Sequence, residues 1–218
     1  MDASSPTEAT SATQRAYRQI RRMVLTGAIP PGSRLKIDAL SARLETGATP
    51  IREALSLLTS DQLVERIDQR GFRAAAVGKA QFEDILAVRC TFEEMALRQS
   101  MARRTPEWEE RLVLSLHRLT RLPHADAEAT ESHHKAFHAA LLDNCGSPLL
   151  IKFCDQLYDL NIRYRYLAAR AASYEARDVD REHAEILAAV LDRDANLAAD
   201  RLIGHYRITG RFLSDWLA

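Results

Sequence analysis

Apolar residues recur every three or four positions along most of the chain, which is the spacing of one helix face. Near the N-terminus two such segments cover 16–27 and 49–63, and a shorter one lies around Leu40. Two short β-like segments, 63–67 and 72–77, follow and are separated by the sequence DQRG. Such pieces around a turn predict a β-hairpin. Three helices followed by a hairpin are the plan of a winged helix-turn-helix.

From Lys79 onward the helical spacing continues and no alternating pattern persists. Thr105 followed by Pro106 marks one helix start, because a hydroxyl can cap a helix and proline fits its first turn. Asp194 is placed to cap the last helix. We expect about six helices of roughly 15–20 residues, which usually form an antiparallel bundle. The predicted fold class is mainly α, with an N-terminal winged helix-turn-helix followed by an antiparallel all-α bundle.

These patterns divide the chain into three parts. Residues 1–14 form a Ser/Thr/Ala-rich tail that we expect to be disordered, 15–78 form the winged helix-turn-helix, and 79–218 form the bundle. The net charge is zero, but 15–78 holds 11 basic and 6 acidic side chains, and the bundle holds 19 and 22. Most basic residues are arginines, which suit phosphates and guanine edges. An Arg-rich solvated surface is an equally good explanation from charge alone.

Composition excludes several classes of protein. Hydrophobic residues make up 46% of the 218 positions, enough to build packed cores. No uncharged apolar stretch approaches the ~20 residues of a membrane span, and the first dozen residues do not read as a secretory signal. The three cysteines are odd in number and lack metal-type spacing, which fits reduced thiols. We therefore expect a cytoplasmic protein.

The first part resembles the DNA-binding domain of GntR-type bacterial transcription regulators. The resemblance is carried by AYRQI, GAIPPGSRL, TPIREAL and QRGF, in that order and spacing. It implies that the third helix enters the major groove of DNA and that the wing tip reaches the minor groove. Thr49 and Arg52 then become groove or phosphate contacts, and Arg70 with Gly71 becomes the wing tip. Arg34 is a candidate from its charge and position.

This segment also departs from the family pattern. Many members carry Ser-Arg immediately before the threonine, where this chain has Gly47 and Ala48. One frequent base-reading arginine is therefore missing, so the operator sequence of better-known relatives does not transfer. The alternative role for Arg52 is an ion pair with Glu53 or another carboxylate.

Histidines on three separate predicted helices share faces with apolar residues. In HKAFH, His134 and His138 lie one turn apart, and His183 and His205 each lie on an apolar stripe. Burying several imidazoles without partners is costly, and they cannot all be protonated close together. A divalent metal bound by neutral rings removes both problems. The alternative is that each is a separate core or surface histidine. Three others are expected at the surface: His117, His124 and His133.

The second part resembles the FCD-type ligand-binding domain of one (FadR-like) GntR subgroup. The resemblance is carried by RCTFEEMAL, HKAFHAALLDNCGSPLL, REHAEIL and the later His205. In many FCD domains an aspartate and three histidines bind a metal, and His134 stands at the place of that aspartate. The resemblance thus implies a four-histidine site short of one anionic ligand, formed by His134, His138, His183 and His205. Such sites suit Zn, Ni or Cu; we expect zinc, with nickel as the alternative.

The resemblance also implies a pocket for a small carboxylate effector beside the metal. Arg89 matches a pocket arginine that holds the carboxylate by a bidentate bond. Asn161 and Arg163 are expected to line the same cavity. The alternative for Arg89 is an ion pair with Glu93, four residues further on, in the weaker base-before-acid orientation.

Three hypotheses follow for the function. The leading one is a homodimeric, non-enzymatic regulator that binds two-fold operator DNA and senses a carboxylate at a metal centre. The second is a metal-dependent hydrolase or isomerase, although no HExxH motif is present and Glu131 is the one carboxylate near the expected site. The third is a regulator that binds an effector and no metal.

Overall fold

The computed structural model describes residues 11–121, 127–168 and 178–217. The chain divides into two compact units, Met1–Val77 and Gly78–Ala218. The predicted surface position of His124 and most of the predicted disordered tail (residues 1–10) lie outside the described residues. None of the described helices is both long and apolar enough to span a bilayer.

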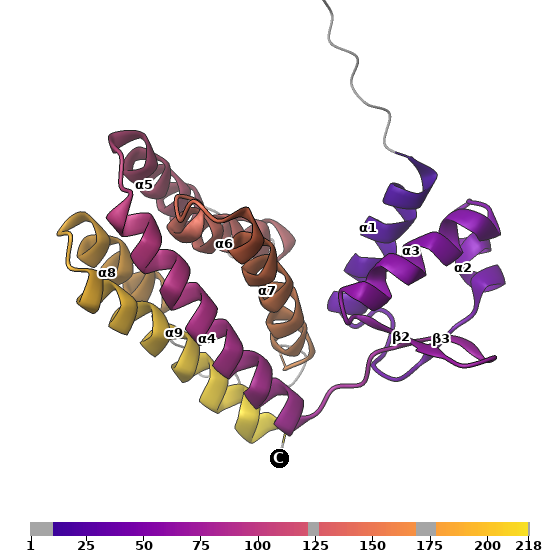
Figure 1. The fold of residues 1–218 in the computed structure, drawn as a ribbon. Coiled ribbons are helices and arrows are strands. Elements are labelled where there is room, and N and C mark those ends of the chain that lie inside the picture. The colour runs from indigo at the N-terminus through magenta and orange to yellow at the C-terminus, as the bar shows by residue number, and fades with distance from the viewer. Residues whose placement is uncertain (1–10, 122–126, 169–177, 218) are drawn as a thin grey trace, which may run out of the picture. The chain divides into compact units, whose positions relative to one another are not determined.

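The first unit holds three helices and a small antiparallel sheet (Figure 1). Its elements are α1 (Ala12–Leu25), β1 (Arg34–Leu35), α2 (Ile37–Arg43), α3 (Ala48–Ser60), β2 (Val64–Ile67) and β3 (Gly71–Ala74). Strand β3 lies between the other two strands, with Leu35 opposite Phe72 and Ile67 opposite Gly71. The apolar stripes of α1 and α3 form the core, in which Ile20, Ile51 and Leu55 are fully buried. The predicted winged helix-turn-helix is confirmed.

Two helix starts differ from the prediction. Helix α1 begins at Ala12, so residues 12–14, expected to belong to the tail, form its first turn. The Ser11 hydroxyl accepts a hydrogen bond from the Gln14 N–H at 3.1 Å and caps this turn. Helix α3 begins at Ala48, one residue before the predicted segment 49–63, with Gly47 at the cap position.

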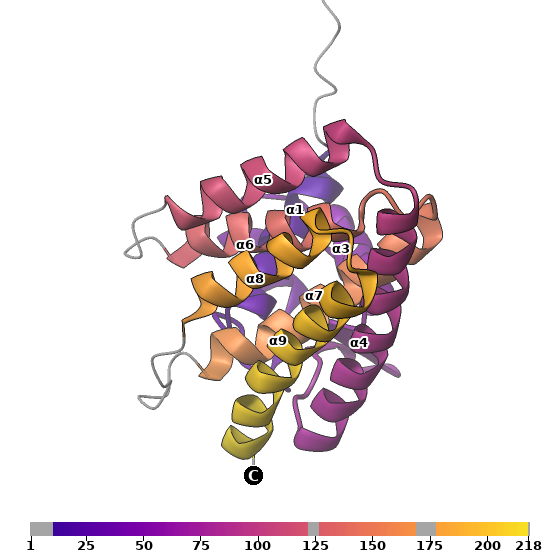
Figure 2. The same cartoon turned by 90° about the vertical axis from the view of Figure 1, so that its left-hand side faces the viewer.

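The second unit is a helical bundle, as predicted. Its helices are α4 (Lys79–Ala102), α5 (Pro106–Thr120), α6 (Ala127–Leu142), α7 (Pro148–Ala168), α8 (Val179–Leu191) and α9 (Ala195–Trp216). Helix α4 packs against both α7 and α9, while α8 packs on α9, and α5 runs beside α6 (Figures 1 and 2). The caps at Thr105 and Asp194 are confirmed, since their side chains accept hydrogen bonds from Trp108 N–H and from Asn196 and Leu197 N–H.

The bundle core is mainly apolar but contains a group of buried histidines. Trp108, Leu112, Phe137 and Leu141 are fully buried, and the Trp108 indole donates to the Ala140 carbonyl at 2.8 Å. Further along α6, α8 and α9, the inward positions are occupied by histidines instead. The packing of these three helices therefore decides whether the histidines meet.

Candidate functional site

The four predicted histidines converge in the bundle. His134 and His138 come from α6, His183 from α8 and His205 from α9, and each is at most 7% exposed. One ring nitrogen from each can be chosen so that all four atoms lie within 4.8 Å of one another. A shared zinc ion would draw these nitrogens closer together, because each zinc–nitrogen bond is ~2.0–2.1 Å long.

The ring of His138 is held by a chain of buried polar groups. Its Nδ1 lies 2.9 Å from the Tyr206 hydroxyl oxygen, and that hydroxyl donates a short hydrogen bond to Glu93 Oε2. The other Glu93 oxygen accepts from Arg89 Nε at 2.6 Å. Glu93, Arg89 and Tyr206 are all buried.

The rings of His134 and His205 are held by carboxylates in similar ways. His134 Nδ1 lies 2.8 Å from the Tyr158 hydroxyl, which donates a short hydrogen bond to Glu131. His205 Nδ1 lies 2.9 Å from Glu182 Oε2. Metal-binding histidines commonly bind a carboxylate, carbonyl or water through their second nitrogen, which fixes the ring and its tautomer.

Two of the ring nitrogens in the cluster have the surroundings expected of metal ligands. His134 Nε2 and His138 Nε2 are buried and have no hydrogen-bond partner among the described residues. Buried polar atoms are nearly always satisfied, so such an atom calls for an explanation such as an ion. Two buried imidazole nitrogens without partners, in a cluster of four rings and with their opposite nitrogens held by hydrogen bonds, fit a borderline-soft divalent cation.

Burial also sets the protonation of these rings. It lowers the pKa of both His134 and His138 well below the usual imidazole value, and the neighbouring cation Arg165 lowers that of His134 further. Burial likewise raises the pKa of Tyr158 and Tyr206 well above that of free tyrosine. The rings are therefore neutral, as metal ligands must be, and the tyrosines keep their protons.

A narrow cavity adjoins the histidines and contains two of the three predicted effector residues. Its lining includes Arg89, His134, Asn161, Arg165 and His205. Its volume is about 10 Å³, the space of roughly one water. Arg89 Nη1 donates to Asn161 Oδ1 at 2.9 Å, so both the predicted Glu93 ion pair and the predicted pocket position of Arg89 are present.

Arg163 is buried but does not line this cavity, whereas Arg165 does. The reason is helix geometry: residues two apart point about 200° apart, whereas residues four apart share a face. Sequence reasoning missed Arg165, although its i+4 spacing from Asn161 was the available signal. It also missed Tyr158 and Tyr206, because tyrosines at helical spacing usually belong to the core.

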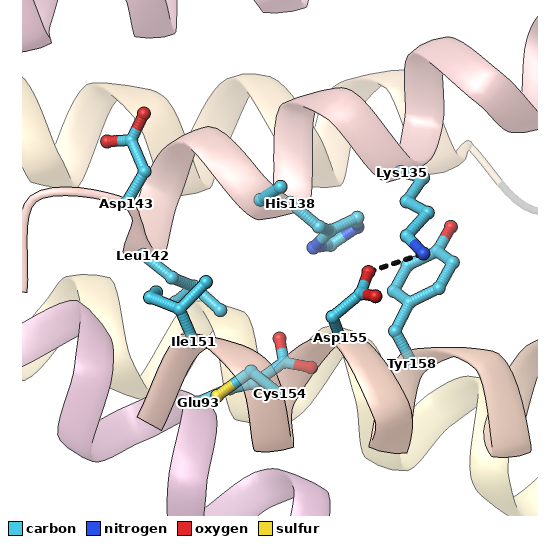
Figure 3. Close-up of a pocket in the computed structure, with 10 residues that line it drawn as sticks. Glu93, Lys135, His138, Leu142, Asp143, Ile151, Cys154, Asp155 and Tyr158 are labelled. Atoms are coloured by element: carbon cyan, nitrogen blue, oxygen red, sulfur yellow. Dashed lines mark ion pairs between the residues drawn. The ribbon is translucent and has the colours of Figure 1, made fainter. Parts of the chain in front are cut away.

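A larger cavity lies between α6 and α7 and reaches His138 from another side (Figure 3). Its volume is about 150 Å³, and its walls include Leu142, Ile151 and Cys154. Lys135 stands at its edge in ion pairs with Asp155 at 2.5 Å and Asp159 at 2.9 Å. Burial raises the pKa of the Cys154 thiol to about 12, so this thiol is protonated and unreactive.

The predicted DNA-contacting residues lie at the surface of the first unit. Thr49 and Arg52 are exposed on α3, while Ile51 between them in sequence is buried. Glu53, the alternative partner of Arg52, accepts a hydrogen bond from the Thr13 hydroxyl at 2.6 Å. The other three are also exposed: Arg34 on β1, Arg70 at the turn between β2 and β3, and Gly71 at the start of β3. Gly71 has φ +88°, a conformation that favours glycine.

Comparison with known proteins agrees with both units. The pattern of the FCD domain matches residues 84–207, more than half of the chain. The sequence pattern of a second family, the bacterial regulatory proteins of the gntR family, matches residues 12–73. The chain belongs to the GntR family. Within it, the FCD domain places the chain in the FCD subgroup, and this GntR-family protein is a DNA-binding transcription regulator.

Relatives match this GntR-family chain over most of its length. The HTH-type transcriptional repressor GlaR of Escherichia coli K12 is 32% identical over 87% of the chain and 90% of that protein. The regulator BphR of Paraburkholderia xenovorans LB400 is 34% identical over 89% of the chain and 82% of that protein. The solved structure of E. coli McbR/YncC shares the fold, with a TM-score of 0.83 at 24% identity, covering 96% of this chain and all of that one. The relatives are named as regulators, not enzymes.

Proposed function

We propose that the chain is a homodimeric regulator whose second unit binds a divalent metal and a small carboxylate, and that this binding alters operator affinity. The observation that carries the proposal is the clustering of four buried imidazoles from three helices, two of which have a buried nitrogen without a hydrogen-bond partner among the described residues. Such an arrangement costs folding energy unless an ion compensates for it.

The four histidines His134, His138, His183 and His205 would hold the metal. Four neutral imidazoles leave the charge of a divalent ion uncompensated. Three carboxylates, however, are hydrogen-bonded to these rings directly or through a tyrosine. Glu182 contacts His205, while Glu93 and Glu131 act through tyrosines. Zinc is the ion that this donor set favours, with nickel as the alternative. When bound, the metal would supply a Lewis-acidic point at which an effector oxygen can be held.

The carboxylate would bind in the narrow cavity. Arg89 Nη2 and Asn161 Nδ2 are buried donors without a hydrogen-bond partner among the described residues. Both can donate to a carboxylate, and the Arg89 interaction would be charge-assisted. The cavity must open to admit one. Arg165 is the side chain placed to move, since it is 29% exposed and lies 3.7 Å from Glu131 and 3.4 Å from His134.

A thermal-shift screen of small mono- and dicarboxylates, with and without zinc, tests this part of the proposal. We expect zinc to raise the melting temperature of the metal-free chain, and one class of carboxylate to raise it further only when zinc is present. Asn161→Asp should abolish the carboxylate shift, because it replaces a donor with a like charge, and should retain the zinc shift. Asn196→Asp, an exposed amide, is the control.

Less than about 0.2 zinc per chain after preparation in zinc-replete medium, without an affinity tag that binds metal, would contradict the metal centre. A carboxylate shift that is independent of zinc would instead favour an effector module without metal.

Operator contacts are proposed for the exposed face of α3 and for the wing. Thr49 and Arg52 would contact the major groove or its phosphates, and Arg70 with Gly71 the minor groove, with Arg34 close to the backbone. All five are exposed in the first unit, where arginine predominates among the basic residues. Arginine forks suit such contacts.

Footprinting on DNA upstream of the chain's own gene tests these operator contacts, which together form the reading surface of the first unit. The double variant Thr49→Ala, Arg52→Ala should weaken binding by at least about tenfold, since a bidentate arginine contact to a base contributes about 1–3 kcal/mol. The slope of log K against log[salt] should also become shallower by about one unit for each lost phosphate contact. Arg118→Ala, an exposed arginine of the second unit, should change neither quantity. A normal footprint from the double variant would show that α3 does not read the operator.

A homodimer would present two such reading surfaces to a two-fold operator. Helices α4 and α7 pack together, and each carries large apolar side chains that are open to solvent, which we call the apolar strip. Met95, Leu149 and Phe153 are 43%, 64% and 42% exposed, and Phe153 lies edge-on to Phe92 at 6.1 Å between ring centroids. We assign this strip to contact with a second copy of the chain, because large apolar side chains gathered on one face mark interaction surfaces.

A further inference from the structure

The location of one proton decides whether His138 can bind a metal. A neutral imidazole carries its proton on Nδ1 or on Nε2, and only the nitrogen without the proton has a lone pair to offer. Nε2 of His138 is buried without a hydrogen-bond partner among the described residues, and one nitrogen of this ring lies within 4.8 Å of a ring nitrogen of each of the other three histidines. Nδ1 lies 2.9 Å from the Tyr206 oxygen. The direction of this hydrogen bond therefore fixes the state of Nε2.

The direction of this hydrogen bond follows from Arg89, the last of the buried groups that extend from His138 through Tyr206 and Glu93. A guanidinium has donors and no acceptor, so the 2.6 Å contact between Arg89 Nε and Glu93 is donated by the arginine. Glu93, only 1% exposed and paired with this cation, is a carboxylate that accepts hydrogen bonds and donates none. The Tyr206 hydroxyl therefore gives its single proton to Glu93. Its oxygen is left as an acceptor, and the His138 Nδ1 must be the donor.

We propose that Tyr206 is a positioning residue that holds His138 in its Nδ1–H form, and that Arg89 enforces this through Glu93. The inference rests on the proposed metal centre and adds the part of the chain that prepares one of its ligands. The Nε2 lone pair is then available before any ion arrives. One guanidinium also serves two sites, because Arg89 donates to Glu93 through Nε and is itself a lining residue of the narrow cavity.

His134 provides a comparison within the same site. Its Nδ1 also contacts a tyrosine, Tyr158, whose hydroxyl donates to Glu131. Arg165 Nη1 lies 3.4 Å from the same Nδ1, however, and an arginine can only donate. The Tyr158 oxygen requires a proton on Nδ1 of His134, whereas Arg165 requires a lone pair there. The tautomer of His134 is therefore held less strictly than that of His138.

Nitrogen-15 NMR of the imidazoles in the metal-free, full-length chain tests the inference directly, because the two tautomers have distinct ring-nitrogen shifts. We expect the Nδ1–H form of His138 in the unmodified chain and a mixture of both forms in Tyr206→Phe. Glu93→Gln keeps the shape of the side chain but can donate an N–H to the Tyr206 oxygen. The tyrosine proton then turns toward His138, which should shift to the Nε2–H form. Tyr164→Phe is the control, since its hydroxyl contacts Gln81 at 3.3 Å.

Zinc titration of the same proteins supplies a second readout. Loss of an outer partner of a metal-binding histidine typically weakens metal affinity by about 10–100-fold. We expect a loss of this size for Tyr206→Phe and for Glu93→Gln, and none for Tyr164→Phe. If Tyr206→Phe does not fold, Glu93→Gln still tests the direction of the relay.

Two outcomes would overturn the inference: an Nε2–H form of His138 in the unmodified chain, or an unchanged tautomer in both relay variants. Failure of the unmodified chain to bind zinc is a different result. It would remove the proposed metal function, while the spectra would still report whether Tyr206 sets the tautomer.

Discussion

At the scale of single residues, the buried imidazoles make stability depend on pH. In the folded, metal-free chain the pKa of His134 and of His138 is well below 6.5, because burial penalises the charged ring. Below about pH 6.5 the unfolded chain therefore binds protons that the folded chain does not. Acidification should lower the free energy of unfolding by up to about 1.4 kcal/mol per pH unit for each such histidine.

Urea unfolding in the presence of a chelator, between about pH 7 and pH 5.5, measures this slope. His138→Gln should reduce the slope by the share of one histidine, whereas the exposed His117→Gln should leave it unchanged. Equal slopes for the unmodified chain and for His138→Gln would mean that His138 does not stay neutral in the folded state.

The residue scale also shows where sequence reasoning succeeded and where it could not. The convergence of His134, His138, His183 and His205 was predictable, because each shares a helix face with apolar residues that must point inward. The role of Tyr206 was not. Its spacing predicts burial, but whether its hydroxyl meets His138 and Glu93 depends on how α4, α6 and α9 are placed against one another, which no local pattern encodes.

At the scale of elements, local signals predicted helix starts when a side chain performs the capping. Thr105 and Asp194 do so, and both starts were right. The start of α1 was wrong by four residues, because Ser11 was grouped with a polar tail, and that of α3 by one residue, because Gly47 occupies the cap position without a side chain. Strand β1 has only two residues and exists because it pairs with β3, so it left no periodic signal of its own.

Two buried charged residues on α4 explain the position of the candidate site. Arg89 and Glu93 lie one turn apart on α4 and are both buried, although charged residues are rarely so placed without partners. Asn161 on α7 and Tyr206 on α9 are those partners, one on each side of α4. Helix α4 therefore joins the narrow cavity to the histidines through its own buried face. A ligand that displaces Arg89 would therefore disturb the hydrogen bonds that reach His138 through Glu93 and Tyr206.

At the scale of the whole molecule, the proposed dimer face can be tested through both assembly and DNA binding. Phe153→Glu places a charge in the apolar strip of Phe92, Met95 and Leu149, where a second copy would bury it without a partner. We expect the dimer dissociation constant to rise by about 30-fold or more, as for the loss of an interface hot spot. Sedimentation velocity over a concentration series measures this shift.

Leu114→Glu on α5 is the matched control, because Leu114 is 46% exposed on a helix outside the strip. A substitution that weakens the dimer should also weaken operator binding, since a two-fold operator is bound by the two copies of a dimer together. Phe153→Glu should therefore bind the full operator little better than a half-site, while Leu114→Glu keeps the full advantage. Should Leu114→Glu dissociate the dimer and Phe153→Glu leave it intact, the copies would meet through α5 and not through the α4–α7 strip.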